Sequence, residues 1–438
     1  MSQKTIVILI LMFFSILYLN KLFWKKEYSY YNIIMILLFI CLGLNIKVAN
    51  NIQSFFDEGN IIYVPVVVFI IATVGIVRIR FNSIKFKLDE FILICILLSI
   101  LLSYMNGQIN DIFKFCSIVV LYLSIFFIGF MYKNLNEYDV ERVLNAFSYM
   151  AIFNGILGIL QYITNKKLLI GAFNDNIFYS QDAGSVKRAV GLAFSNNAGG
   201  NLGAILFCIV LFNYLRTKMK IHLLAVILNG IFLALTLTRL GYLAAIAETV
   251  LFFLFSKWNS ISRIIKKMSF VLFGACSALI IALIYGEKIY NTLFIQRGDT
   301  QMSRAIQYQN VFQNIIAKNT FWNGIGVGQY RYYSYYNLGI PDIDIHSQYV
   351  SVLTEQGVFI FILFIILNLY ILKMALANAQ QELEKVFIVS LFIGNLICCN
   401  FNPNEYYLVN NLLYYLLMYC YVYKKRKIIV KNAGGQNE

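Results

Sequence analysis

Apolar runs follow one another along most of the chain, separated by short breaks that are charged or rich in asparagine. Most runs are close to the roughly 20 residues that a helix needs to cross a bilayer. A membrane β-barrel would instead show shorter segments of alternating hydrophobicity. The pattern predicts about thirteen transmembrane helices, at residues 5–23, 29–46, 61–77, 91–106, 112–132, 144–163, 199–215, 221–238, 240–256, 268–285, 350–372, 386–402 and 405–423.

The composition agrees with this pattern. The 438 residues are 60% hydrophobic and only 13% charged, with a mean hydropathy of +0.70, which is too apolar for a soluble protein. The predicted fold class is therefore an all-α polytopic membrane protein with about 12–13 transmembrane helices.

The cationic residues predict how the chain is oriented. Lys and Arg are enriched in cytoplasmic loops, and here they cluster in every second connection, around residues 21–26, 78–87, 133–142, 216–220, 257–267, 373–385 and 424–431. The net charge of +15 is spread over these loops and not concentrated in one basic domain, so we expect no nucleic-acid partner. The alternation predicts a cytoplasmic C-terminus.

Two long polar stretches, residues 164–198 and 286–349, fall on the opposite, outer side. They divide the chain into helices 1–163, a first outer loop 164–198, helices 199–285, a second outer loop 286–349, helices 350–423 and a basic tail 424–438. All eight cysteines lie in apolar spans, so we expect neither a metal site nor a disulfide. No cofactor is predicted.

The first outer loop ends in a candidate anion site. Arg188 precedes a Gly- and Asn-rich run that leads directly into the span at 199–215. Residues Ser195 to Asn197 are good helix N-cap types, and the unpaired N–H groups of a helix start favour anions. The run is therefore either a phosphate site beside Arg188 or an ordinary capped helix entry with a solvated arginine.

Arg239 lies between two spans that almost touch in sequence. Its guanidinium presents a planar fork of donors that matches phosphate oxygens. The alternative is an arginine that extends along the helix to reach water. Glu248, nine residues further, lies on the opposite helical face, so we expect it to be hydrogen-bonded inside the bundle and not paired with Arg239.

The second outer loop contains a helix candidate at 301–317, with Arg304 near its start. Ala305, Tyr308, Phe312 and Ile315 recur at helical spacing, while Gln307, Gln313 and Asn314 are expected to face away. Such a helix would lie along the membrane surface, as a lid that holds Arg304 or as a plain connector.

His346 closes this loop where the next span starts. A histidine there could orient or deprotonate a sugar hydroxyl near neutral pH, or form a helix-start hydrogen bond. Glu355 lies nine residues further on another helical face, which argues against a His–Glu pair.

The glycine run 324–328 does not lie in a strand–helix–strand unit, so we interpret it as a turn that lets backbone approach another group. The tyrosines that follow, Tyr330, Tyr332, Tyr333, Tyr335 and Tyr336, could stack on sugars or form an interfacial aromatic belt.

In this order the motifs resemble the O-antigen ligase and polymerase superfamily of bacterial envelope proteins, which includes the Wzy-type polysaccharide polymerases. The matching elements are Arg188 with Gly191 and Asn197, Thr238-Arg239, Arg304, Gly324-Ile-Gly326, and His346 followed by Glu355-Gln-Gly357. The resemblance implies a GT-C-like, metal-independent glycosyltransferase of the cytoplasmic membrane, with its active site facing outside.

The implied substrate is an oligosaccharide carried by undecaprenyl pyrophosphate. Arg188, Arg239 and Arg304 would bind the pyrophosphate, His346 and Arg239 would be catalytic, and Asn197, Tyr330 and Tyr349 would contact substrate. The expected function is polymerisation of repeat units into capsular or other surface polysaccharide, with a flippase and a chain-length regulator as candidate partners. The alternatives are a ligase that transfers the glycan to another acceptor, and a flippase or transporter.

Overall fold

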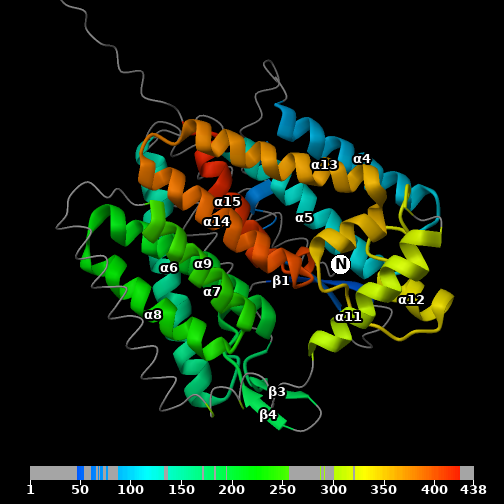
Figure 1. The fold of residues 1–438 in the computed structure, drawn as a ribbon, viewed down its shortest axis with the longest axis horizontal. Helices are drawn as coiled ribbons and strands as arrows, with labels where there is room; N and C mark the ends of the chain where they lie inside the picture. The colour runs from blue at the N-terminus through cyan, green and yellow to red at the C-terminus, as the bar shows by residue number, and fades with distance from the viewer. Residues whose placement is uncertain are drawn as a thin grey trace, which may run out of the picture.

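A computed structural model describes residues 47–53, 61–65, 87–132, 137–169, 172–181, 184–193, 195–255, 300–318 and 321–424, together with isolated positions between 68 and 76 and at 287 and 291. The described part is helical apart from two short hairpins. Its principal helices are α4 (Leu88–Met105), α5 (Ile112–Met131), α6 (Glu137–Thr164), α7 (Asn196–Thr217), α8 (Lys220–Thr236), α9 (Arg239–Phe255), α11 (Thr300–Asn310), α12 (Tyr330–Leu338), α13 (Gln348–Asn378), α14 (Glu382–Asn400) and α15 (Leu408–Val422) (Figure 1).

Five of these helices, α4, α5, α6, α7 and α13, are long and apolar enough to cross a membrane, and α8 and α15 are shorter apolar helices. The helices α4 to α9 and α13 to α15 correspond to the spans predicted at 91–106, 112–132, 144–163, 199–215, 221–238, 240–256, 350–372, 386–402 and 405–423. The all-α, multi-pass membrane class is therefore confirmed. The spans predicted at 5–23, 29–46 and 268–285 lie outside the described residues.

The prediction for 61–77 was wrong at its start. Ile61–Pro65 forms strand β2, which pairs antiparallel with β1 (Lys47–Gln53). The run of isoleucine, tyrosine and valine has high β propensity, and a partner strand is available, so the apolar segment begins as a hairpin. A second hairpin, β3 (Phe178–Gln181) with β4 (Gly184–Lys187), lies in the first loop, where no strand was expected.

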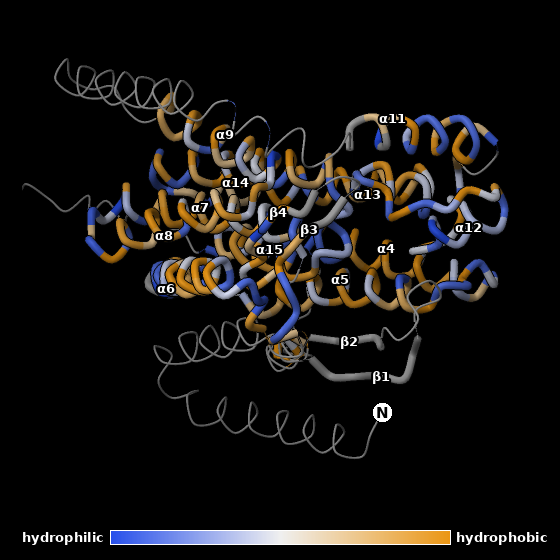
Figure 2. Tube along the Cα trace, turned by 90° about the horizontal axis from the view of Figure 1, so that it is seen from below, coloured by the Kyte–Doolittle hydropathy of each residue, from blue (hydrophilic) through white to orange (hydrophobic). Residues whose placement is uncertain are grey.

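The described helices form one bundle in which α7 and α15 are the most enclosed. Every residue of α15 from Asn410 to Val422 is buried. α7 packs against α6, α8, α9 and α14, and α15 packs against α5 and α13. The bundle helices are predominantly hydrophobic, whereas α11 is predominantly hydrophilic (Figure 2).

The connections 106–111, 165–195, 237–238 and 401–407 meet at one end of the bundle, beside α11 and α12, which we call the loop end (Figure 1). Side-chain hydrogen bonds fasten two of them to neighbouring helices: Gln329, just before α12, accepts from Asp111 N at 2.7 Å, and Asn402 donates to Asn201 of α7 at 3.1 Å. At the opposite, basic end, Lys424 contacts Glu384 at 2.6 Å. These positions follow the alternation predicted from the cationic clusters; the division of the chain into six parts stays a prediction.

Candidate functional site

Two parallel helices begin side by side at the loop end. α7 and α9 approach so closely that a methyl group on Gly200 would lie 2.3 Å from the Thr238 Cβ, and one on Gly241 would lie 2.6 Å from the Gly200 carbonyl oxygen. Glycine is thus required at both contacts. The close packing places two helix N-termini, each with partly unpaired N–H groups and a positive dipole end, at one point.

The α7 start has no side-chain cap. Ser195 occupies the predicted N-cap position, but its side chain makes no capping hydrogen bond. The first N–H groups of α7 therefore do not receive the side-chain acceptor that such residues usually supply. Arg239 is the first residue of α9 and is half-buried next to this start. Together these groups can hold an anion.

Arg188 is fully buried, with 1% of its surface exposed, and is not a solvated arginine. Its Nε donates to the Thr236 carbonyl oxygen at 2.9 Å, and its Nη2 donates to the Thr238 hydroxyl at 2.9 Å and the Asn197 amide oxygen at 3.3 Å. One guanidinium thus joins the end of α8, the start of α9 and the start of α7. It brings its charge to the two helix starts and fixes their positions.

The backbone around Arg188 is held from several sides. Arg188 N donates to the Ile177 carbonyl oxygen at 3.0 Å, which fastens it to the first loop. From α6, Gln161 accepts from Gly191 N at 2.8 Å and Asn154 accepts from Leu192 N at 3.0 Å. Gly191 adopts a φ of +57°, where a Cβ would collide with Asn154 and Phe232, so glycine is needed there.

His346 is fixed by α11. Its N–H donates to Gln307 Oε1 at 3.0 Å, its Nδ1 lies 3.4 Å from the same oxygen, and the Tyr308 hydroxyl donates to its carbonyl oxygen at 2.8 Å. The helix-start role considered for His346 belongs to Ser347, which caps α13 by accepting from Val350 N at 3.3 Å. Capping of α13 therefore does not involve the imidazole, whose Nδ1 faces Gln307.

Burial and the charges around His346 set its protonation state. Burial and, after it, the nearby positive charge of Arg304 lower the pKa of His346 to about 4, while Asp344 and Asp342 act in the opposite direction. The imidazole is therefore neutral at neutral pH and carries a free lone pair.

Tyr407 connects His346's surroundings to those of Arg188. Burial and the charge of Asp344 raise the pKa of Tyr407, while hydrogen bonding to Ser195 and Asn197 and the charge of Arg304 lower it. Tyr407 thus contacts the α7 start and lies within electrostatic range of Arg304. Arg188, Asn197, Arg304 and His346 are brought into one region at the loop end, with Tyr407 between them.

The helix containing Arg304 was predicted correctly, and the face that it buries was predicted in part: Ile315 is buried, Tyr308 packs against the same cluster, and Gln313 is exposed, as expected. The structure has α11, a π-helical turn (Val311–Ile315) and a 3₁₀ turn (Ile316–Lys318) in place of the predicted 301–317 helix. Gln307 is buried and Phe312 is 46% exposed, the reverse of the expectation. The Gln307 amide enters the protein because it satisfies the backbone of 343–346, donating to the Ile343 carbonyl at 3.0 Å.

The two candidate substrate tyrosines point into the protein. Tyr330 is 3% exposed and donates to Asp342, and Tyr349 is half-buried with its ring 5.7 Å from that of Phe364. On α12, Tyr335 and Tyr336 are exposed, with ring centroids 4.9 Å apart. A role of Tyr330 or Tyr349 in substrate binding stays a prediction.

The glycine run forms the expected turn, and it docks on a break in α13. Gly357 has non-helical dihedral angles (φ 79°, ψ 173°). The turn donates to the carbonyls freed there, from Ile325 N to Thr354 at 3.1 Å and from Gly326 N to Glu355 at 3.0 Å. The Glu355 carboxylate in turn accepts from Gly328 N at 2.8 Å and Tyr330 N at 3.0 Å. Glu355 therefore organises this turn, in agreement with its expected separation from His346.

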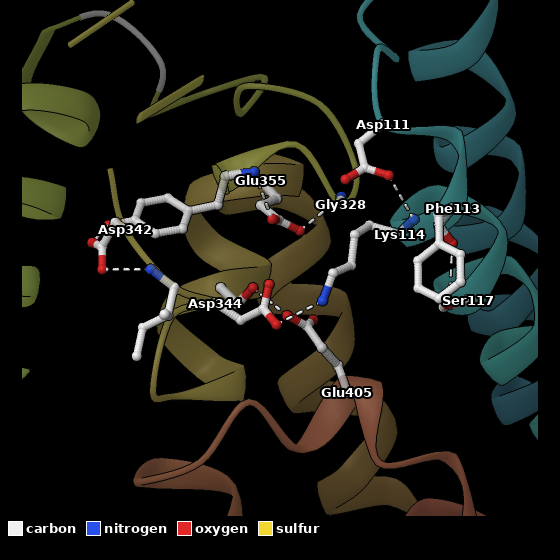
Figure 3. A network of polar contacts seen from close by, with 12 residues as sticks. Asp111, Phe113, Lys114, Ser117, Gly328, Asp342, Asp344, Glu355 and Glu405 are labelled. Atoms are coloured by element: carbon white, nitrogen blue, oxygen red, sulfur yellow. Dashed lines mark hydrogen bonds and ion pairs between the residues drawn. The ribbon is translucent and has the colours of Figure 1, made fainter. Parts of the chain in front are cut away.

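A charged network that the sequence did not reveal lies beside this turn (Figure 3). Lys114 of α5 forms a 2.6 Å ion pair with Asp344, two residues from His346, and lies 4.0 Å from the centre of the Tyr406 ring. Glu405 accepts from the Ser351 hydroxyl. Burial raises the pKa of Glu405 well above its ordinary value, and the charge of Glu355 raises it further. A lysine inside the predicted span 112–132 was the available signal.

Glu248 is another correction. It is fully buried where α9 meets Gly394 of α14, and among the described residues neither carboxyl oxygen has a hydrogen-bond partner, contrary to the expectation. The missing side chain of Gly394 leaves the room that the carboxyl fills. No group of three or more potential metal ligands occurs within the described ranges.

Comparison with known families supports the resemblance. No curated protein matches the chain. Residues 223–365 match the family model Wzy_C, described as O-Antigen ligase. This range contains Arg239, Arg304 and His346, whereas Arg188 and Lys114 lie before it. The chain therefore carries, in residues 223–365, a domain of the Wzy_C O-antigen ligase family of polysaccharide-biosynthesis membrane proteins.

Proposed function

We propose that the protein is a glycosyltransferase that polymerises oligosaccharide repeat units carried on undecaprenyl pyrophosphate into a capsular or other surface polysaccharide. The growing glycan is transferred from its lipid pyrophosphate to the sugar of a new lipid-linked repeat. The observation that carries the proposal is the gathering of Arg188, Arg239 and Arg304 with His346 at one end of a membrane bundle.

The leaving group in this reaction is a lipid pyrophosphate. The bond between the anomeric carbon and the pyrophosphate oxygen breaks, and the electron pair leaves with the phosphate. Fixed positive charge stabilises the negative charge that develops there. The starts of α7 and α9, with Arg239 beside them and the buried Arg188 behind them, supply such charge. Arg304 adds charge from the α11 side.

The acceptor hydroxyl needs a base. With His346 Nδ1 directed at Gln307, Nε2 carries the lone pair that takes the proton as the acceptor oxygen bonds to the anomeric carbon. The charge of Arg304 keeps the pKa of His346 low. An anionic donor beside Arg304 offsets that charge, so donor binding would raise the pKa and strengthen the base.

In this proposal the loop end, and with it the reaction, lies outside the cytoplasmic membrane; the cationic clusters at the basic end support this orientation. The sugar would then be used on the face where a flippase delivers it, and a chain-length regulator would act there. Metal independence and the GT-C class belong to the same proposal.

The second candidate is a ligase that transfers the finished glycan to a different acceptor. The description of the matching family, O-Antigen ligase, favours it. Both enzymes break the same donor bond, so the arginines and His346 would have the same roles. The products differ: loss of a polymerase leaves single repeats, whereas loss of a ligase leaves long chains still attached to the lipid pyrophosphate.

The test uses the purified full chain in lipid nanodiscs with lipid-linked repeat units, followed by separation of the products by size. Wild-type protein is expected to lengthen the repeats, and Arg239→Ala to abolish lengthening. Arg216→Ala, an arginine at the basic end of α7, is the matched control and is expected to retain activity. An Arg239→Ala protein that makes polymer at the wild-type rate refutes the anion site. Wild-type protein that leaves the repeats unchanged favours the flippase alternative.

A further inference from the structure

Lys114 lies where a lysine is energetically unfavourable. It is the third residue of α5, is only 8% exposed, and belongs to a helix long and apolar enough to cross a membrane. The positive end of the helix dipole opposes a cation in this first turn, and burial opposes any charge. Asp111 caps α5 by accepting from the backbone N of Lys114 at 3.2 Å. The contacts of the ammonium group are needed to offset the remaining cost.

The ammonium group of Lys114 contacts two segments of the loop end. It forms the 2.6 Å ion pair with Asp344, in the segment between α12 and His346, and lies 4.0 Å from the centre of the Tyr406 ring, in the connection 401–407. Figure 3 shows it directed toward the Asp344 carboxylate, with the Glu405 carboxylate beside them. A cation over an aromatic face is attracted to it, more strongly where water is excluded. One side chain of the bundle thus connects both segments.

Each of these segments leads directly to a group of the candidate site. His346 lies two residues beyond Asp344. Tyr406 is followed by Tyr407, which contacts the start of α7. Lys114 therefore links the segment of the base to the connection that reaches the anion site, and it does so from a helix that carries neither.

The Asp344 carboxylate faces both halves of the site. Its negative charge raises the pKa of His346 and also that of Tyr407, so it lies within electrostatic range of the base and of the anion site. An unpaired carboxylate there would repel a pyrophosphate. Lys114 supplies the compensating charge from α5, and Arg304 acts from α11. The other acids that face Asp344 or His346 are Asp111, Asp342, Glu355 and Glu405.

Building on the proposed function, we propose that Lys114 is a positioning residue for the transfer reaction, which aligns the His346 segment with the anion site and neutralises the carboxylate that faces both. It acts through Asp344 and Tyr406 and not on the substrate. Lys114 lies before the residues that match the Wzy_C family, whereas Asp344 lies within them. The ion pair therefore joins the family domain to an earlier helix of the chain.

Donor kinetics in the nanodisc transfer assay test the neutralising role. Lys114→Met leaves Asp344 unpaired and should raise the KM for the lipid pyrophosphate donor about tenfold, the effect of one uncompensated charge at a distance on the order of 10 Å. The double variant Lys114→Met/Asp344→Asn removes both charges and should return the donor KM to near the wild-type value. Because the double variant has no unpaired charge at this position, it should fold even if Lys114→Met does not.

The pH–rate profile gives an independent measurement at the base. Asp344→Asn removes a charge that raises the pKa of His346, so the acid limb should move to lower pH, whereas Lys114→Met should move it to higher pH. A lysine with only a structural role would reduce the amount of active enzyme without moving the limb. Lys385→Met is the matched control, since Lys385 lies near the start of α14 and pairs with Glu382 at 2.8 Å, and it should change neither measurement.

Two results overturn the inference. Lys114→Met has the donor KM and the acid limb of the wild type, or the double variant keeps a donor KM as high as that of Lys114→Met. Where Lys114→Met yields no folded protein, a donor KM raised about tenfold in the double variant, or an unmoved acid limb in Asp344→Asn, overturns it instead.

Binding of radiolabelled undecaprenyl pyrophosphate to the purified full chain separates this inference from the proposed function. Lys114→Met should bind this lipid about tenfold more weakly than the wild type does, and the double variant should bind it nearly as tightly as the wild type. If the wild type transfers no glycan but shows this difference, the proposed function fails and the link between Lys114 and the anion site stands. If the wild type transfers glycan and all variants bind and react alike, the inference about Lys114 fails alone.

Discussion

Replacing Arg188 with alanine should damage the fold at the loop end as well as activity. The guanidinium is buried and joins the end of α8 to the starts of α7 and α9 through Thr236, Thr238 and Asn197. Alanine leaves these acceptors without their donor and removes a buried charge from the anion site. Both stability and glycan transfer are therefore expected to fall.

The magnitude follows from the two short hydrogen bonds of Arg188, both 2.9 Å long. A hydrogen bond that involves a charged group contributes about 1.5–3 kcal/mol, so their loss should lower the free energy of unfolding by about 3–6 kcal/mol. The 3.3 Å contact adds less. Arg188→Lys keeps the charge but reaches at most one of the three acceptors, so it should lie between alanine and wild type.

Thermal unfolding of the purified protein in one detergent, followed by fluorescence, measures this effect, and the transfer assay measures activity in parallel. Arg216→Ala removes an arginine from the other end of α7, 18% exposed, whose ion pair with half-exposed Glu141 is 3.6 Å long; with no short hydrogen bond to lose, it should cost less than Arg188→Ala. If Arg188→Ala unfolds at the same temperature as Arg216→Ala, the bracing role is refuted, whatever its activity.

Three further predictions concern the glycine break, the buried lysine and the histidine. Gly357→Ala places a Cβ 2.1 Å from the Trp322 carbonyl oxygen at a φ of +79°, so it should lower the unfolding temperature. Gly230→Ala, which has open space around its Cβ, should leave that temperature unchanged. Equal unfolding temperatures for the two variants would contradict the prediction. Lys114→Met leaves the neighbouring carboxylates without their cation and should lower the free energy of unfolding, measured with denaturant, by about 3–5 kcal/mol. The loss should be smaller in a variant in which Asp344 is also replaced by a neutral residue. Arg304→Gln should raise the pKa of His346 from about 4, moving the acid limb of the pH–rate profile to higher pH; an unmoved limb argues against the base. Because this folded pKa lies below the ordinary 6.5, wild-type stability linked to His346 is full above pH 6.5 and is lost as the pH falls towards 4.

The sequence predicted the helices well because long apolar runs determine them. The boundaries of α5 and α9 differ from the predicted spans by a residue or so. The turn formed by Gly324 to Gly328 could also be predicted from the sequence. Closely spaced glycines outside a strand–helix–strand unit indicate a turn that lets the backbone approach another group. Local pattern was sufficient in each of these cases.

The charged network could not be derived in the same way, because its members lie far apart in the chain. Lys114, Asp344 and Glu405 belong to three different elements, and only tertiary packing places them together. The burial of Gln307 on α11 was missed for a related reason. Gln307 enters the interior to satisfy a distant backbone, which overrides the hydrophobic pattern that favoured Phe312.

The backbone contact between α7 and α9 constrains how such an enzyme can diversify. Since Gly200 and Gly241 have no room for an added methyl group, neither helix start can shift without the other. The positions of both helix starts around Arg239 are therefore expected to be kept together. A mutant library aimed at new sugar specificity should therefore leave these helices intact. It should randomise exposed positions away from them, such as Asn106 after α4.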